Sequence, residues 1–191
     1  MYLALTQNQP ETELLTAVAA GDRKATVALV KRFERPVFAL LSRMLGTADP
    51  HRLEDIAQEV FLKVFRALPN FDPKGKAQLS TWVLTIATRV AIDELRRRPA
   101  DVPTGELPEP TVVPQVEQVI DRARLGQAIE QAALSLPEGQ RAAFVLRVYH
   151  ELGYPEIAEA LGVDVGTVKS RISRARAALK RALRHTGWED L

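Results

Sequence analysis

Five prolines within sixteen residues divide this chain of 191 residues into two parts: Pro99, Pro103, Pro108, Pro110 and Pro114. A proline inside a helix removes a backbone hydrogen bond and clashes with the preceding turn, so no regular helix runs through this stretch. Acidic residues stand between the prolines, a composition typical of an extended linker. The sequence therefore predicts a linker at 99–118 between separate domains at 10–98 and 119–186.

Apolar residues recur at helical spacing on both sides of this linker, and no stretch shows the alternation expected of a β-strand. Between residues 12 and 45 they form three successive stripes. Gly21 and Asp22 separate the first stripe from the second, and Asp22 has a side chain suited to a helix N-cap. Gly46 ends the third stripe.

The same periodicity predicts two more helices in the N-terminal part, at 52–68 and 81–97, with Ser80 as the N-cap of the second. In the C-terminal part it predicts four helices, at 119–136, 138–150, 155–161 and 165–183. The predicted fold class is all-α: two small helical domains joined by a Pro-rich linker, the C-terminal one a helix-turn-helix.

Composition argues against several classes of protein. The chain has no cysteine, which rules out disulfides and thiolate metal sites, and its three histidines are not at metal-ligand spacing. It has no signal peptide and no apolar run of about 18 residues that would span a membrane. We also find no glycine-rich phosphate loop and no nucleophile paired with a base. We therefore expect a cytoplasmic protein that is not an enzyme, with no cofactor and no membrane insertion.

The strongest local motif is the segment from Tyr154 to Ile172. A short predicted helix ends at Gly162, where glycine most readily adopts the left-handed conformation that terminates a helix. Asp164 is placed to cap the next helix. Apolar residues on both helices are spaced to pack the two against each other at a steep angle, which is typical of a helix-turn-helix.

The second helix of this motif carries an unbroken basic face, with no acidic residue between Val165 and His185. A recognition helix presents its N-terminal residues to base edges in the major groove, where arginine pairs with guanine. A solvated charged helix is the alternative interpretation. Because the glycine turn, the cap and the basic face occur together, we favour DNA binding by Thr167, Lys169, Ser170, Arg171, Arg174 and Arg176.

Two N-terminal segments complete a larger pattern: DIAQEVFLKVF at 55–65 and STWVLTIATRVAIDELRRR at 80–98. Together with PEIAE at 155–159 and GTVKSR at 166–171, they closely resemble bacterial RNA polymerase sigma factors of the extracytoplasmic-function (ECF) class. The resemblance covers nearly the whole chain. It implies a protein that binds RNA polymerase core and directs promoter-specific transcription initiation under the control of an anti-sigma factor.

The resemblance also implies a division of labour. The N-terminal domain would bind the clamp coiled coil of the polymerase β′ subunit and melt the minus-ten promoter element, and the C-terminal domain would bind the minus-thirty-five element and the β flap. Asp55, Gln58 and Glu59 share one helix face at spacings i, i+3 and i+4. This face suits a basic coiled coil, although a merely solvated face has the same pattern.

The minus-ten contacts are expected from two places. The loop 70–78 contains Phe71, Lys74 and Lys76 and is suited to hold an extruded base. Phe71 either stacks on that base or anchors the loop to the core, and Trp82 is more typical of a core residue.

Arg96 and Arg97 fit phosphate contacts at the end of the following helix. The chain departs from the family pattern at two positions. Arg89 stands where family members often have asparagine, which puts the minus-ten base preference in doubt. Gly153 stands where a serine usually caps the helix-turn-helix.

Two other functions are compatible with the same motifs. One is a helix-turn-helix regulator that binds duplex DNA without being a polymerase subunit. The other is an adapter whose basic helix binds an acidic protein. A gel shift with and without core polymerase separates these functions from that of a sigma factor.

Overall fold

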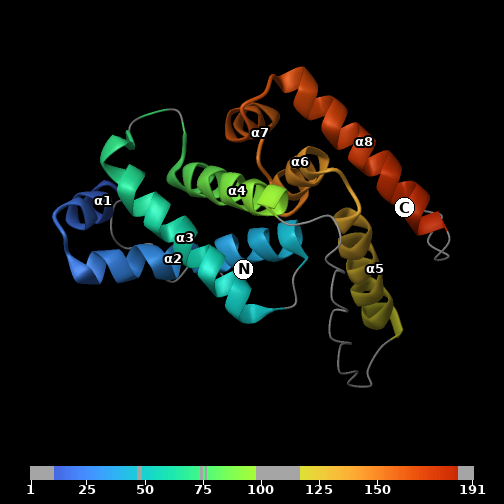
Figure 1. Ribbon diagram of the computed structural model, residues 1–191, viewed down its shortest axis with the longest axis horizontal. Helices are drawn as coiled ribbons and strands as arrows, with labels where there is room; N and C mark the ends of the chain where they lie inside the picture. Colours follow the sequence, from blue (N-terminus) through green and yellow to red (C-terminus); the bar gives the residue numbers. More distant parts are fainter. Residues whose placement is uncertain (1–10, 47–48, 74, 76, 98–116, 185–191) are drawn as a thin grey trace.

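The computed structural model describes residues 11–46, 49–73, 75, 77–97 and 117–184, with only the backbone described at 117–124. Every regular element within these residues is helical (Figure 1), so the all-α prediction is confirmed. The N-terminal part contains α1 (Glu11–Ala19), α2 (Arg23–Leu45), α3 (Pro50–Ala67), the 3-10 turn η1 (Leu68–Asn70) and α4 (Leu79–Arg97). The C-terminal part contains α5 (Glu117–Leu134), α6 (Glu138–Val148), α7 (Tyr154–Leu161) and α8 (Val165–Leu183). Most of the predicted linker lies outside the described residues.

The ends of α2 are set by two residues that the sequence analysis identified. The carboxylate of Asp22 accepts hydrogen bonds from the backbone N–H groups of the first turn, as an N-cap does. Gly46 ends the helix in the left-handed conformation, with φ 59°. The second and third apolar stripes belong to this one helix, which contains Pro36.

Two predicted helix starts differ from the structure. The third helix begins at Pro50 rather than near residue 52, because Asp49 caps it and proline is well suited to the first helical position. The prediction that Ser80 is an N-cap is wrong. The fourth helix begins at Leu79, and the carbonyl of Gln78 accepts the first helical hydrogen bond, so Ser80 lies within the first turn.

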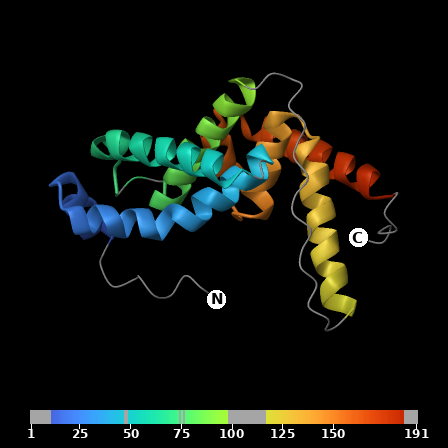
Figure 2. The ribbon, with the colours of Figure 1, turned by 60° about the horizontal axis from the view of Figure 1, so that its bottom comes forward.

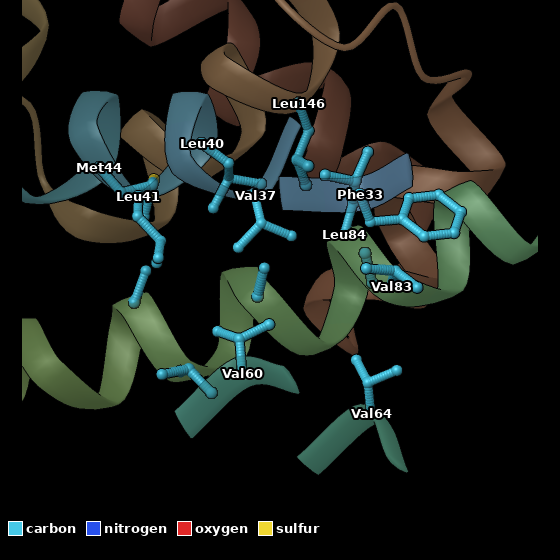
Figure 3. Close-up of a cluster of buried hydrophobic side chains, with 14 of the residues drawn as sticks. Phe33, Val37, Leu40, Leu41, Met44, Val60, Val64, Val83, Leu84 and Leu146 are labelled. Atoms are coloured by element: carbon cyan, nitrogen blue, oxygen red, sulfur yellow. The ribbon is translucent and has the colours of Figure 1, made fainter. Parts of the chain in front are cut away.

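The core of the N-terminal part lies between α2, α3 and α4. Their buried side chains face one another (Figure 3), and Leu146 from α6 lies in the same cluster. The labelled members are Phe33, Val37, Leu40, Leu41, Met44, Val60, Val64, Val83, Leu84 and Leu146. This core therefore continues across the predicted domain boundary.

In the C-terminal part, α6, α7 and α8 form a compact group around buried Ile157, Val168 and Ile172. A second, smaller cluster joins α5 to α8 through residues such as Ala133 and Leu179. Figure 2 shows α5 beside the end of α2 and α8 extending away from the N-terminal helices. Within the described part of the chain, none of the helices combines the length and apolar character needed to cross a membrane.

The two parts of the chain pack directly against each other. Helix α4 contacts α6 and α7, and α2 contacts α5 and α6. The buried guanidinium of Arg141 donates a hydrogen bond of 2.6 Å to the carbonyl of Met44 at the end of α2. Gly46 lies so close to Leu134 that a Cβ at this glycine would approach the leucine side chain to 2.6 Å. The sequence predicted two helical units, but it gave no indication of this contact between them.

Candidate nucleic-acid interface

The turn between α7 and α8 has the geometry that the sequence predicted. Gly162 adopts φ 63° and ψ 39° at the end of α7, the left-handed conformation expected there. The N–H of Val163 then donates to the carbonyl of Ala158 at 3.0 Å, which closes the turn. Ala158 itself is buried. These contacts fix the direction in which α8 leaves the turn.

Asp164 caps α8, as predicted. Its carboxylate accepts hydrogen bonds from both the backbone N–H and the hydroxyl of Thr167, at 2.8 and 2.6 Å. These two bonds lower the pKa of Asp164. The bond from the Thr167 hydroxyl has the larger effect, and the bond from the Thr167 backbone N–H has the smaller one. Ser170 in turn donates to the carbonyl of Thr167 at 2.9 Å. The two candidate hydroxyl residues of the recognition helix are therefore held in defined positions.

The candidate cations of α8 fall into two groups. Lys169, Arg174 and Arg176 are exposed. Arg171 is half-buried, and its guanidinium lies against Gly139 of α6, where a Cβ would come within 3.0 Å of Cζ. The structure thus brings a basic, largely solvent-exposed surface together along α8, with one arginine ordered against the neighbouring helix.

The N-cap of α7 is Gly153, which Glu156 supports. The N–H of Gly153 donates to the Glu156 carboxylate at 2.6 Å, which is the glutamate half of a capping box. The same carboxylate accepts a hydrogen bond of 2.9 Å from the hydroxyl of Thr81 on α4. Glu156 therefore supports the helix that lacks the usual serine cap and also links α7 to the N-terminal part.

The predicted acidic face lies on the surface of α3. Asp55 and Gln58 are exposed, and Glu59 forms an ion pair of 2.9 Å with Lys63 one turn later. Leu62 lies on this face and is 55% exposed, although it is a large apolar residue. Sequence reasoning missed Leu62. Leu62 stands four residues after Gln58 and outside the buried stripe of α3. This spacing would have placed it on the acidic face from the sequence alone.

Phe71 and Trp82 lie together in the structure. Their ring centroids are 4.9 Å apart with planes inclined by 44°, and both side chains are partly buried against the core. The sequence analysis considered two roles for Phe71, stacking on an extruded base and anchoring the loop to the core. This contact corresponds to anchoring. Lys74 and Lys76, the loop cations predicted beside it, lie outside the described residues.

The three candidate arginines of α4 have different surroundings. Arg89 is exposed and donates long hydrogen bonds of 3.4 and 3.5 Å to carbonyl oxygens in the last turn of α7. Arg96 donates two hydrogen bonds, of 2.7 and 2.9 Å, to one carboxylate oxygen of Glu138 on α6. The hydrogen bonding and charge of Glu138 raise the pKa of Arg96 further above its usual value. Arg97 is exposed.

Two family models match this chain. One is described as Sigma-70 region 2 and covers residues 29–99; the other is described as Sigma-70, region 4 and covers residues 126–179. The first spans the acidic face of α3 and the arginines of α4. The second spans the helix-turn-helix. Together they cover more than half of the chain.

The chain is also similar over most of its length to known proteins. It is 36% identical to the ECF RNA polymerase sigma factor SigW of Bacillus subtilis, over 87% of this chain and 93% of the relative. It is 34% identical to the RNA polymerase sigma-H factor of Pseudomonas aeruginosa, over 94% and 96% of the two chains. The ECF RNA polymerase sigma-E factor of Escherichia coli is 36% identical over 87% of this chain and 90% of its own.

Solved structures share the fold. CnrH, in complex with the cytosolic domain of CnrY, matches with a TM-score of 0.62 and 26% identity over 91% of this chain and 96% of CnrH. The sigma factor RpoE of Bartonella quintana, in complex with the anti-sigma factor NepR, matches with a TM-score of 0.60 and 22% identity over 81% and 94% of the chains. The chain therefore belongs to the ECF class of RNA polymerase sigma factors.

Proposed function

We propose that this chain binds RNA polymerase core and directs it to promoters by contacting two DNA elements. The observation that carries the proposal is the complete helix-turn-helix, with its capped basic helix α8, in the same chain as an exposed acidic face on α3. One surface is suited to a protein partner and the other to DNA. The family is one of transcription factors rather than enzymes, and neither surface requires bond-making chemistry.

The acidic face of α3 is proposed to bind the clamp coiled coil of the β′ subunit. Asp55, Gln58 and Glu59 offer acceptors for basic side chains of a partner helix. Leu62 adds an exposed apolar group within the same face. Protein interfaces typically concentrate their binding energy in such an apolar contact surrounded by polar groups. The face therefore has the composition of a docking site rather than of an ordinary solvated surface.

Helix α8 is proposed to read the minus-thirty-five element in the major groove. Its N-terminal turn carries Thr167, Lys169 and Ser170, which can reach base edges or phosphates. Arg174 and Arg176 are exposed further along the helix and are suited to base or phosphate contacts. Contact between the C-terminal domain and the β flap is proposed from the family resemblance alone.

The minus-ten element is proposed to bind along α4 and the loop before it. Arg89, Arg96 and Arg97 supply positive charge on α4, while Phe71 holds the loop through its contact with Trp82. Lys74 and Lys76 of the loop remain proposed contacts to the unpaired strand. Binding of extruded bases offsets an unstacking cost of a few kcal/mol for each base.

We also propose that an anti-sigma protein controls this chain. The support comes from its membership of the ECF class and from CnrH, which was solved with the cytosolic domain of a second protein, CnrY. Such a partner would cover surfaces that core polymerase needs.

Reconstitution with core polymerase tests the proposed function. The purified chain is expected to associate with core at low salt and to support transcription from defined starts, which genome-wide mapping of transcript ends would reveal. Asp55→Asn should weaken association with core, whereas the matched control Glu13→Gln, at an exposed residue of α1, should not. Arg174→Ala should weaken upstream-element binding by roughly 1–3 kcal/mol if this arginine contacts a base. Failure of the wild-type chain to bind core without an inhibitor present refutes the proposal.

A further inference from the structure

The side chain of Arg171 lies against a neighbouring helix. It is half-buried, whereas Lys169, Arg174 and Arg176 of the same helix are exposed. Its guanidinium rests on Gly139, the second residue of α6, where a Cβ would lie 3.0 Å from Cζ, 3.1 Å from Nη1 and 3.3 Å from Nε of the arginine. The guanidinium of Arg171 is therefore placed over α6 and not along the exposed face of α8.

Gly139 leaves the space that this guanidinium occupies. The three atoms nearest to a Cβ at position 139 all belong to Arg171. Unbonded heavy atoms normally pack at about 3.5–4.0 Å, so a side chain at this position would push the guanidinium away. The backbone itself does not require glycine, because the left-handed glycines of the described chain are Gly21, Gly46 and Gly162. Gly139 is needed for the contact with Arg171 and not for the path of the chain.

The donors of this guanidinium are left without an acceptor by the described part of the chain. Arg141 donates to three carbonyl oxygens and Arg96 to a carboxylate, but no described residue forms a hydrogen bond or ion pair with Arg171. A guanidinium offers five N–H donors in a planar fork that matches a phosphate. A fork that is held in place with its donors unpaired is suited to an anion supplied by a partner.

The position of α6 decides which part of DNA this guanidinium can reach. Helices α6 and α8 pack together (Figure 1), and packed helix axes are about 8–10 Å apart. The major groove is about 12 Å wide and admits one helix. If α8 enters the groove, α6 stays outside, beside the sugar-phosphate strand that borders it. A guanidinium that rests on α6 therefore lies near phosphates and away from base edges.

We propose that Arg171 binds a phosphate at the border of the major groove and that Gly139 is the residue that positions it. Arg171 thus differs in role from residues that read bases. The proposal rests on the proposed function in taking α8 as the helix that enters the groove. It adds a positioning residue on α6, outside the helix-turn-helix.

Loss of a phosphate contact has two consequences that loss of a base contact lacks. A phosphate is present in every sequence, so Arg171→Ala should weaken binding of a mixed-sequence duplex and of a promoter duplex by the same factor, about threefold to tenfold. Neutralising one phosphate fewer also reduces the slope of the logarithm of the binding constant against the logarithm of salt concentration, by about 0.9 in magnitude. A base contact would contribute to the promoter duplex alone.

Substitutions at Gly139 should act through the arginine. Gly139→Ala brings a methyl group to 3.0 Å from Cζ, and the flexible side chain of Arg171 can retreat slightly, so we expect about a twofold loss of affinity. Gly139→Leu fills the space, and its loss should approach that of Arg171→Ala. Neither substitution should lower stability, since alanine and leucine favour a helix more than glycine does.

The experiment is a fluorescence anisotropy titration of the full chain at several salt concentrations. The probes are a mixed-sequence duplex and the upstream region of a promoter located by transcript mapping. Gly126→Leu on α5 is the matched control, because nothing lies within 4 Å of a Cβ there. Arg23→Ala, at an exposed residue of α2, controls for the loss of one positive charge. Urea unfolding of each variant measures stability.

Arg171→Ala and the two Gly139 variants should weaken the binding of both probes as stated, and the control variants should bind as the wild type does. In the Arg171→Ala background, Gly139→Leu should cause no further loss. The proposal is overturned if Gly139→Leu weakens binding equally in that background. It is also overturned if Arg171→Ala affects the promoter probe alone or neither probe.

The outcome for this proposal is separate from the outcome for the proposed function. A chain that binds duplex with the expected pattern but fails to bind core polymerase would refute the proposed function and leave the role of Arg171 standing. A chain that binds core normally but whose duplex binding is unchanged by Arg171→Ala would refute the role of Arg171 alone.

Discussion

Replacing Arg141 by methionine probes how strongly the two parts of the chain are joined. The side chain is only 9% exposed, and its guanidinium donates to carbonyl oxygens of three residues. The bonds to Met44 and Leu136 measure 2.6 and 3.1 Å, and the third acceptor is the carbonyl of Leu134. These carbonyls lie at the end of α2, at the end of α5 and just before α6. One planar cation thus ties together three chain segments.

The expected loss of stability follows from what the substitution leaves behind. Methionine fills much of the same volume but donates no hydrogen bond, so three carbonyl groups lose a donor at a largely buried site. Each unsatisfied buried acceptor costs about 1–3 kcal/mol, and removal of the buried charge offsets part of that sum. We expect Arg141→Met to lower the free energy of unfolding by about 3–5 kcal/mol. Arg141→Lys should recover little, because an ammonium lacks the planar fork that reaches several acceptors.

Urea unfolding followed by circular dichroism measures this change through linear extrapolation. Arg181→Met, at an exposed residue of α8, is the matched control, and it should change the free energy of unfolding by less than about 0.5 kcal/mol. A loss below about 1 kcal/mol for Arg141→Met would refute the reasoning, because solvent would then have to satisfy the three carbonyls.

Three further outcomes are expected. In a binding titration, Leu62→Asp should weaken core polymerase binding by at least about tenfold while leaving urea unfolding nearly unchanged. The control is Val27→Asp, at an apolar residue of α2 that is 45% exposed, and it should leave the affinity for core unchanged. Burial, and secondarily the charge of Arg43, lower the pKa of His150 from 6.5 to about 4. As pH falls, the imidazole is therefore protonated in the unfolded chain before it is protonated in the folded one. The free energy of unfolding should decrease as pH falls from 6.5 towards 4, by about 1–2 kcal/mol after allowance for partial solvent exposure. His150→Gln should flatten that part of the pH profile of urea unfolding. Gly162→Ala should lower the free energy of unfolding by about 1–2 kcal/mol, because φ is 63° there, and an unchanged urea midpoint would contradict this.

Features set by local chemistry could be predicted from the sequence. Gly46 and Gly162 end helices in the left-handed conformation, and Asp22 and Asp164 cap the helices that follow them, because each of these effects depends on a few neighbouring residues. Ser80 was misassigned for a related reason. A serine near a helix start is equally compatible with the cap and with the first turn, and the sequence does not distinguish positions two residues apart.

Features that depend on tertiary contacts could not be predicted in this way. Glu138 and Glu156 have the pattern of ordinary first-turn acids, and only the fold shows that they bind residues of α4. Arg141 has the pattern of a surface cation on a helix, yet it is buried. The candidate site shows the same division. Helical spacing placed Asp55, Gln58 and Glu59 on one face, but spacing cannot show that acceptors on other helices already hold Arg89 and Arg96.

The positions of the two proposed surfaces imply an order of events at a promoter. While α4 packs against α6 and α7, Asp55, Gln58 and Leu62 remain exposed on α3, so core polymerase can bind them without separating the two parts of the chain. The proposed DNA surface of α4, in contrast, contacts α6 and α7 through Arg96 and Arg89. Weakening the contact of α4 with α6 should therefore leave the affinity for core unchanged and increase only the binding of DNA. Glu138→Lys replaces the attraction between Glu138 and Arg96 by a repulsion, and the control Glu11→Lys makes the same charge change at a glutamate paired with Arg32 within the N-terminal part. A binding titration with core should give the same dissociation constant for both variants. A clear difference between the two would mean that core binding itself requires opening, and that the docking surface extends beyond α3 into the interface between the two parts.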